Sequence, residues 1–239
     1  MTATLLAVAH GTADPAGVAE VEQLIGLVRA GRPGVPVELG WLERVRPAAA
    51  EVLRGLAGPV VVVPVLLSTG YHVKVDIAAL VGDRPRTVVA RQLGPDRRIT
   101  AIVADRLRPG RHRGADVVLF GAGSSDPEAL AHLAEVATDL QALLRADEPG
   151  TSPVVHPRFL TDVEGWRRGI PDGADLANYL LAPGHFNDRL PDRAARLGSR
   201  WWAPPLGAHP ALAAVIWDRY DEALAAAEDL GAGSGAGAG

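Results

Sequence analysis

The feature that most constrains this chain is a sequence pattern that occurs twice. Three pairs of segments match in the same order: AHGTADP (9–15) with GAGSSDP (121–127), LLSTGYH (66–72) with LLAPGH (180–185), and QLGPDRRITAIVADRL (92–107) with PLGAHPALAAVIWDRY (205–220). The first pair is 112 residues apart, from Ala9 to Gly121. Repetition at a nearly constant spacing predicts two homologous halves.

We therefore expect an N-terminal half at residues 1–113, which carries the site, and a degenerate C-terminal half at residues 114–230. The last nine residues, 231–239, read GAGSGAGAG, and this low-complexity composition predicts a flexible tail.

Within each half, strand-like runs alternate with helix-like runs. In the first half we expect strands at residues 4–9, 35–42, 60–67 and 87–93, and helices near residues 16–30, 48–56, 77–80 and 97–107. The run 60–67 is β-branched and uncharged, which is typical of a strand buried on both faces. Such alternation predicts an α/β fold of two halves, each a mainly parallel sheet flanked by helices. In the second half, Trp201 and Trp202 are expected to begin the last strand.

Helix starts are marked by the same dipeptide in both halves. Asp14-Pro15 and Asp126-Pro127 occupy matching positions of the repeat. Asp accepts hydrogen bonds from the first free amides of a helix, and Pro fits the first helical position. These dipeptides therefore predict scaffold rather than chemistry.

Composition limits the classes of function. The 239 residues are 48% hydrophobic and 22% charged, which is the balance of a folded globular protein. The absence of cysteine excludes disulfides, thiolate metal sites and cysteine nucleophiles, and suits a reducing cytoplasm. A net charge of −4 without a long basic block argues against nucleic acid as a partner. We expect no signal peptide, and no membrane association, because the longest apolar run is too short to span a bilayer.

Three polar residues follow three predicted strands. His10 ends the first strand, Glu43 follows the second, and His72 follows the third through residues 68–71. The carboxyl ends of parallel strands share one edge, where open α/β folds bind their ligands. Position 122 of the second half is Ala where the first half has His10, so a site there would belong to the first half. The spacing alone leaves two interpretations, a ligand site or hydrogen-bonded residues at a sheet edge.

The segments LLAVAHGTADP, VPVELGWLE and VVVVPVLLSTGYHVKVDIAAL resemble the class II tetrapyrrole chelatases, in particular the sirohydrochlorin chelatase family of siroheme and cobalamin biosynthesis. The resemblance covers residues 3–230 and is stronger in the first half. It implies an enzyme in which His10 and His72 bind the metal and Glu43 completes the site. It departs from the family at Ala13, where a basic residue is usual.

Metal insertion displaces two pyrrole protons, so a metal donor and a proton acceptor must lie close together. We expect His10, His72 and Glu43 to fill these catalytic and metal-binding roles, with Co²⁺, Fe²⁺ or Ni²⁺ as the metal substrate. No organic cofactor is expected. The macrocycle is expected in a cleft between the halves.

Substrate contacts are expected from loops near the histidines and from basic side chains that could pair with the carboxylates of the macrocycle. These residues are Thr12, Ser68, Thr69, Gly70, Tyr71, Lys74, Arg44, Arg46 and His185. Arg91 is a further rim candidate. Trp41 and Tyr71 could form walls for a flat ring, although Trp41 suits core packing equally well.

Two other classes of function compete with the chelatase. A metal or tetrapyrrole carrier would bind the same ligands without turnover. A phosphoryl-transfer enzyme with a strand-end histidine is disfavoured, because Ala9 and Ala13 flank His10 and no phosphate-binding GxxxxGK[ST] motif occurs. A duplicated chain can form both walls of a cleft, so we expect a monomer.

Overall fold

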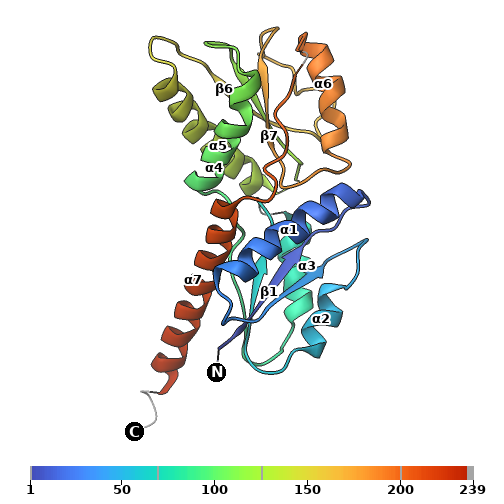
Figure 1. The fold of residues 1–239 in the computed structure, drawn as a ribbon, viewed down its shortest axis with the longest axis vertical. Coiled ribbons are helices and arrows are strands. Elements are labelled where there is room, and N and C mark those ends of the chain that lie inside the picture. Colours follow the sequence, from blue (N-terminus) through green and yellow to red (C-terminus); the bar gives the residue numbers. More distant parts are fainter. Residues whose placement is uncertain (1, 69, 125, 200, 236–239) are drawn as a thin grey trace.

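The computed structural model describes residues 2–68, 70–124, 126–199 and 201–235. It consists of two parallel sheets with helices on their faces, which confirms the α/β architecture expected from the sequence (Figure 1). The first sheet has the order β2-β1-β3-β4 and the second the order β6-β5-β7. All strand pairs within them are parallel.

The first sheet contains β1 (Thr4–Ala9), β2 (Val37–Trp41), β3 (Val60–Pro64) and β4 (Thr87–Val89). Its central strands β1 and β3 are fully buried, as the β-branched run predicts. Helices α2 (Ala49–Gly55) and α3 (Tyr71–Val81) cover one face, where Leu6 and Val62 meet Leu53 and Ile77. Helices α1 (Pro15–Gly31) and α7 (Pro210–Gly235) cover the other face.

The second sheet contains β5 (Val117–Gly121), β6 (Val155–Phe159) and β7 (Asp175–Tyr179). One face packs against α4 (Arg97–Leu107) and α5 (Pro127–Asp147). The other packs against α6 (Leu190–Leu197) and a loop that contributes Trp166. Two short 3₁₀ turns, η1 (Arg108–Gly110) and η2 (Asn187–Arg189), precede β5 and α6.

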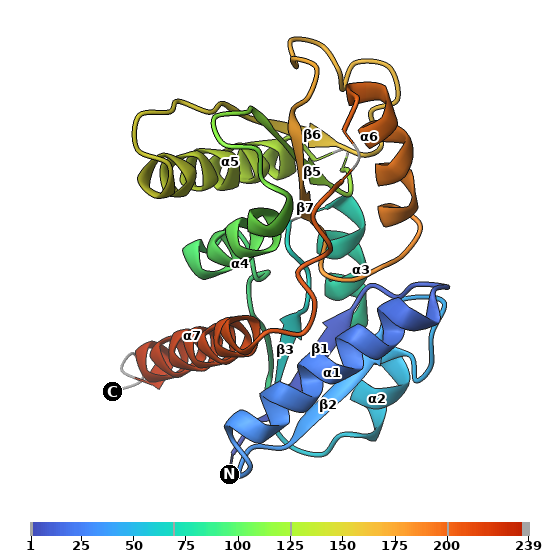
Figure 2. The same ribbon diagram turned by 45° about the horizontal axis from the view of Figure 1, so that its top comes forward.

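Helices α4 and α7 each pack on the sheet of the other half. Helix α4 follows β4 in the chain but lies with the second sheet, whereas α7 returns from the second half to the first (Figures 1 and 2). The two crossings place residues of both halves in one hydrophobic cluster. We propose the division near Gly114 for the sequence repeat alone, because α4 and α7 each pack on the sheet of the other half.

Matching backbone hydrogen bonds appear at matching positions of the repeat. The amide of Leu93 donates to the carbonyl of Leu66 at 2.9 Å, and that of Leu206 donates to the carbonyl of Leu180 at 2.9 Å. The predicted caps are confirmed, because Asp14 and Asp126 each accept a bond from a backbone amide two residues ahead.

Several elements differ from the expectation by more than one residue at an end. Strand β2 spans Val37–Trp41 rather than residues 35–42, and β4 ends at Val89 rather than at residue 93. Helix α3 spans Tyr71–Val81, where a short helix at residues 77–80 is expected. Strand β3 ends at Pro64 rather than at residue 67, and α3 begins at Tyr71, so His72 lies in the first turn of a helix. The strand expected at Trp201 and Trp202 is wrong: residues 201–206 run beside β7 without forming one. Pro204 and Pro205 lack the amide hydrogens that a strand ladder needs. Helix α7 continues to residue 235, where the sequence predicts a flexible tail from residue 231.

Among the described residues, no helix combines the length and apolarity needed to cross a bilayer.

Candidate metal and tetrapyrrole site

His10 and Glu43 meet at the carboxyl edge of the first sheet. The Glu43 amide donates a hydrogen bond to the His10 carbonyl at 3.0 Å, which extends the β1–β2 pairing by one step past the strands. Their side chains follow, with His10 Nε2 3.7 Å from Glu43 Oε1. The two side chains are 55% and 48% exposed, so this pair of donors is open to a ligand from solvent.

Gly11 allows the two strand ends to approach this closely. Its φ of 106° lies in the left-handed region, and a Cβ atom there would stand 2.0 Å from the Glu43 carbonyl oxygen. No side chain fits such a gap. The glycine after His10 is therefore a condition for the His10–Glu43 geometry.

The nearby arginines have different partners. Arg44 Nε lies 3.2 Å from Glu43 Oε1, and its φ of 63° is uncommon for a residue with a side chain. Arg46 is paired with Glu51 at the start of α2. Arg91 is paired with Glu222 on α7 at 2.9 Å. Trp41 is 2% exposed and packs in the core, so it is not a free wall for a ring.

His72 is placed by its backbone only. It is the second residue of α3, which is capped by Gly70 and follows the carboxyl end of β3. The side chains of Tyr71, His72 and Lys74, and the whole of Thr69, lie outside the described residues. Ser68 and Gly70 are half-buried. Within the part of the chain that is described, no group of three His, Asp or Glu side chains could hold a metal.

A loop of the second half packs against the start of α1. A Cβ atom on Gly17 would lie 2.3 Å from the Pro183 carbonyl oxygen, and one on Gly184 would lie 2.9 Å from Thr12 Oγ1. Thr12 also accepts a hydrogen bond from the Asp14 amide at 3.1 Å. The loop with His185 is thus held beside the residues that follow His10.

His185 itself is exposed and contacts a residue that the sequence analysis missed. Arg189 Nη2 lies 3.1 Å from His185 Nε2, four residues away in the chain. The repeat gave no signal for Arg189, because the matched segment ends at His185.

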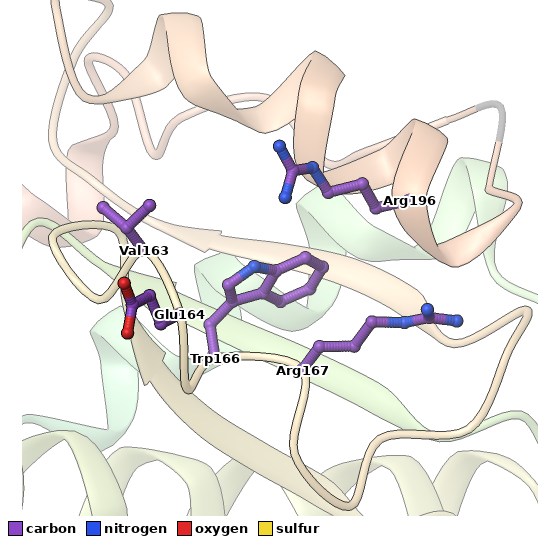
Figure 3. A pocket seen from close by; sticks show the side chains of 5 residues that line it. All are labelled: Val163, Glu164, Trp166, Arg167 and Arg196. Atoms are coloured by element: carbon purple, nitrogen blue, oxygen red, sulfur yellow. The ribbon is translucent and has the colours of Figure 1, made fainter.

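One surface hollow lies elsewhere. It has a volume of about 620 Å³ and is lined by Val163, Glu164, Trp166, Arg167 and Arg196 (Figure 3). It is formed by α6 and the loop before β7, and contains none of the predicted site residues. Trp166 is 2% exposed, and both arginines are paired with neighbouring aspartates, so the hollow presents little free recognition chemistry.

Residues 4–109 match the model of the CbiX family. No curated protein sequence matches the chain. Among solved structures, the chain is similar to SirB from Bacillus subtilis with Fe³⁺, at 25% identity and a TM-score of 0.74 over 96% of this chain and 98% of that one.

Two further structures share the fold. The sirohydrochlorin chelatase SirB from Bacillus subtilis subspecies spizizenii in complex with cobalt is 23% identical, with a TM-score of 0.75 over 93% of this chain and 95% of that one. CbiX, described as the terminal enzyme for siroheme biosynthesis in denitrifying bacteria, is 19% identical, with a TM-score of 0.67 over 92% and 99% of the two chains.

Proposed function

The chain belongs to the class II tetrapyrrole chelatases, and from this premise we propose that it inserts a divalent metal ion into sirohydrochlorin or a similar acidic tetrapyrrole. The observation that carries the proposal is the His10–Glu43 pair. Its donors lie 3.7 Å apart and are half exposed at a ligand-binding sheet edge, within the segment that matches the CbiX model.

The proposed chemistry uses this pair in two ways. A neutral imidazole offers one ring nitrogen to a metal, and a carboxylate accepts a proton or adds a weaker metal bond. We assign His10 as a metal ligand, His72 as the second, and Glu43 as a third ligand or as the acceptor of a pyrrole proton.

Loose binding of the metal is part of the proposal. Structural metal sites surround the ion with four ligands and retain it, whereas a site that transfers its ion must stay open. The half exposure of His10 and Glu43 is the open arrangement that transfer requires. Histidine and carboxylate ligands suit Co²⁺, Fe²⁺ and Ni²⁺, and the similar SirB structures hold iron or cobalt.

The test is metal insertion into sirohydrochlorin, followed by absorbance, with Co²⁺, Fe²⁺ and Ni²⁺ compared. We expect His10→Ala, His72→Ala and Glu43→Gln to slow insertion by about 100-fold or more, the usual effect of removing a positioned proton-transfer group. The matched control is Glu164→Gln, which removes an exposed carboxylate of the second half and should leave the rate unchanged.

The competing function is a carrier that binds metal or macrocycle without turnover. Binding of sirohydrochlorin by the folded protein, without insertion above the spontaneous rate for any of the three metals, would establish the carrier and refute the chelatase. A cytoplasmic location and a monomeric state stay predictions from the sequence.

A further inference from the structure

The segment from Pro183 to Arg189 lies next to the proposed site although it belongs to the second half. It follows β7 at the carboxyl edge of the second sheet. Pro183 and Gly184 pack against Gly17 and Thr12, and Thr12 is two residues from His10. A large ligand placed over the His10–Glu43 pair would therefore extend towards this segment.

Arg189 is a cation that has no carboxylate partner among the described side chains. Its Nη1 donates to the carbonyl of Leu160 at 3.1 Å, and its Nη2 contacts His185 Nε2 at 3.1 Å. None of the ion pairs found among the described side chains includes it, whereas Arg196 on the same stretch is paired with Asp192 at 3.0 Å. The Leu160 carbonyl fixes one arm of the guanidinium and leaves the other arm facing an exposed histidine.

This arrangement suits an anion with two acceptor oxygens. A guanidinium presents parallel N–H donors that match a carboxylate, and fixing the side chain beforehand lowers the entropy lost on binding. The Phe186 ring steadies both groups, with the Arg189 guanidinium carbon 5.6 Å and the His185 ring 5.7 Å from its centre. Because a guanidinium only donates, His185 Nε2 accepts the bond from Arg189 Nη2. His185 therefore positions the guanidinium, and the remaining N–H donors of Arg189 can receive one carboxylate.

We propose that Arg189, assisted by His185, binds a peripheral carboxylate of the tetrapyrrole. The second half then holds the macrocycle while the first half handles the metal. This inference rests on the proposed function for the identity of the ligand. It assigns Arg189 a role in affinity for the acidic ring and none in the insertion step itself.

The test compares binding of metal-free sirohydrochlorin and of its fully methylated ester to wild type, Arg189→Ala and Arg189→Lys, by absorbance titration. Loss of a charged hydrogen-bonded contact should weaken binding of the acid about 10- to 100-fold in Arg189→Ala. Arg189→Lys keeps the charge without the two-armed donor and should fall between. Binding of the ester should be equal in all three proteins.

Two controls separate this effect from general ones. Arg196→Ala removes a paired arginine of α6 and should bind the acid as wild type does. Added salt should lower the affinity for the acid more steeply in wild type than in Arg189→Ala, because the variant lacks one ionic contact. Arg189→Lys supplies the comparison if Arg189→Ala does not fold.

The outcomes distinguish the two proposals. If wild type inserts metal and Arg189→Ala binds the acid as tightly as wild type, the role of Arg189 is refuted and the chelatase stands. If wild type binds the macrocycle without inserting metal, the chelatase is refuted, and a weaker acid complex of Arg189→Ala still supports the carboxylate contact.

Discussion

The hydroxyl group of Tyr179 on β7 donates a hydrogen bond to the carbonyl oxygen of Leu67, 112 residues earlier in the chain, at 3.4 Å. Leu67 lies between β3 and α3, the helix whose second residue is His72. Gly94 leaves room for this contact, since a Cβ atom there would lie 2.2 Å from the hydroxyl oxygen. Burial raises the pKa of Tyr179 above its usual range, which keeps the hydroxyl a donor. The second half thus supports the backbone that leads to His72.

We expect Tyr179→Phe to weaken metal binding more than its loss of stability would suggest. Removing one buried hydrogen bond costs about 0.5–1.5 kcal/mol of unfolding free energy. The control is Tyr220→Phe, which removes a buried bond to the Ala3 carbonyl at 2.7 Å on the other side of the sheet. Both variants should lose similar stability in denaturant, but only Tyr179→Phe should raise the KM for the metal. An equal KM for the metal in the two variants would show that the Tyr179 hydrogen bond does not support the start of α3.

The contact between Gly17 and Pro183 predicts opposite effects for two glycines of α1. Alanine stabilises an exposed helix position by about 1 kcal/mol relative to glycine, and this is expected for Gly26→Ala, where no atom lies within 4 Å. Gly17→Ala would press against the Pro183 carbonyl and should destabilise the protein by roughly 1–3 kcal/mol. Thermal unfolding of both variants checks the prediction. Stabilisation by both would show that the 183–185 loop does not hold this position in solution.

Gly11→Ala should disturb the site as well as the fold. A left-handed backbone costs about 1–2 kcal/mol for a residue with a Cβ atom, and this alone applies to Gly58→Ala, whose φ of 86° faces open space. Gly11→Ala adds a clash with the Glu43 carbonyl oxygen at 2.0 Å. We expect it to be less stable than Gly58→Ala and to lose most insertion activity. Equal stability and activity would contradict the close approach of the two strand ends.

The pH dependence of stability should include a contribution from Asp96, which caps α4 and contacts Arg98 and the buried Arg219. Burial by itself would raise the pKa of Asp96, but the hydrogen bonds and charges of the two arginines outweigh it and hold the pKa below its usual value. The ionised form is therefore favoured in the folded state. Its stabilisation is complete above the unfolded pKa of about 3.9 and is lost as pH falls through the folded value.

Asp96→Asn keeps a capping side chain and removes the charge. The difference in unfolding free energy between wild type and Asp96→Asn should be largest near neutral pH and shrink below about pH 4. Urea unfolding at a series of pH values measures this difference. A difference that is constant with pH would show that the charge of the Asp96 carboxylate does not stabilise the contact between α4 and α7.

Much of the first half was predictable because its elements have strong local signals. The apolar run 4–9 and the pattern 97–107 gave the bounds of β1 and α4 as the structure has them. The caps at Asp14 and Asp126 are chemical signals that need only a few residues. The proximity of His10 and Glu43 followed from the rule that parallel strands end at one edge.

What could not be predicted depends on contacts between distant segments. Alternation of strands and helices does not say which sheet a helix covers, so the crossings of α4 and α7 gave no signal. A pair of tryptophans suggested a strand at residue 201, but the prolines that follow remove the donors that would form it. Arg189 gave no signal in the sequence, because its contacts with the Leu160 carbonyl and His185, and its lack of an ion pair among the described side chains, depend on the packing of segments distant in the chain.

The crossing of α4 and α7 makes the two halves depend on each other to fold. A fragment that ends near residue 113 would keep α4, whose partner sheet is gone, and would leave bare the sheet face that α7 covers. The complementary fragment would carry α7 without the strands it packs on. Each piece alone would present a large apolar surface to water, while the two mixed together could cover both surfaces. We therefore expect the two fragments to associate when they are mixed and to regain the structure of the intact protein.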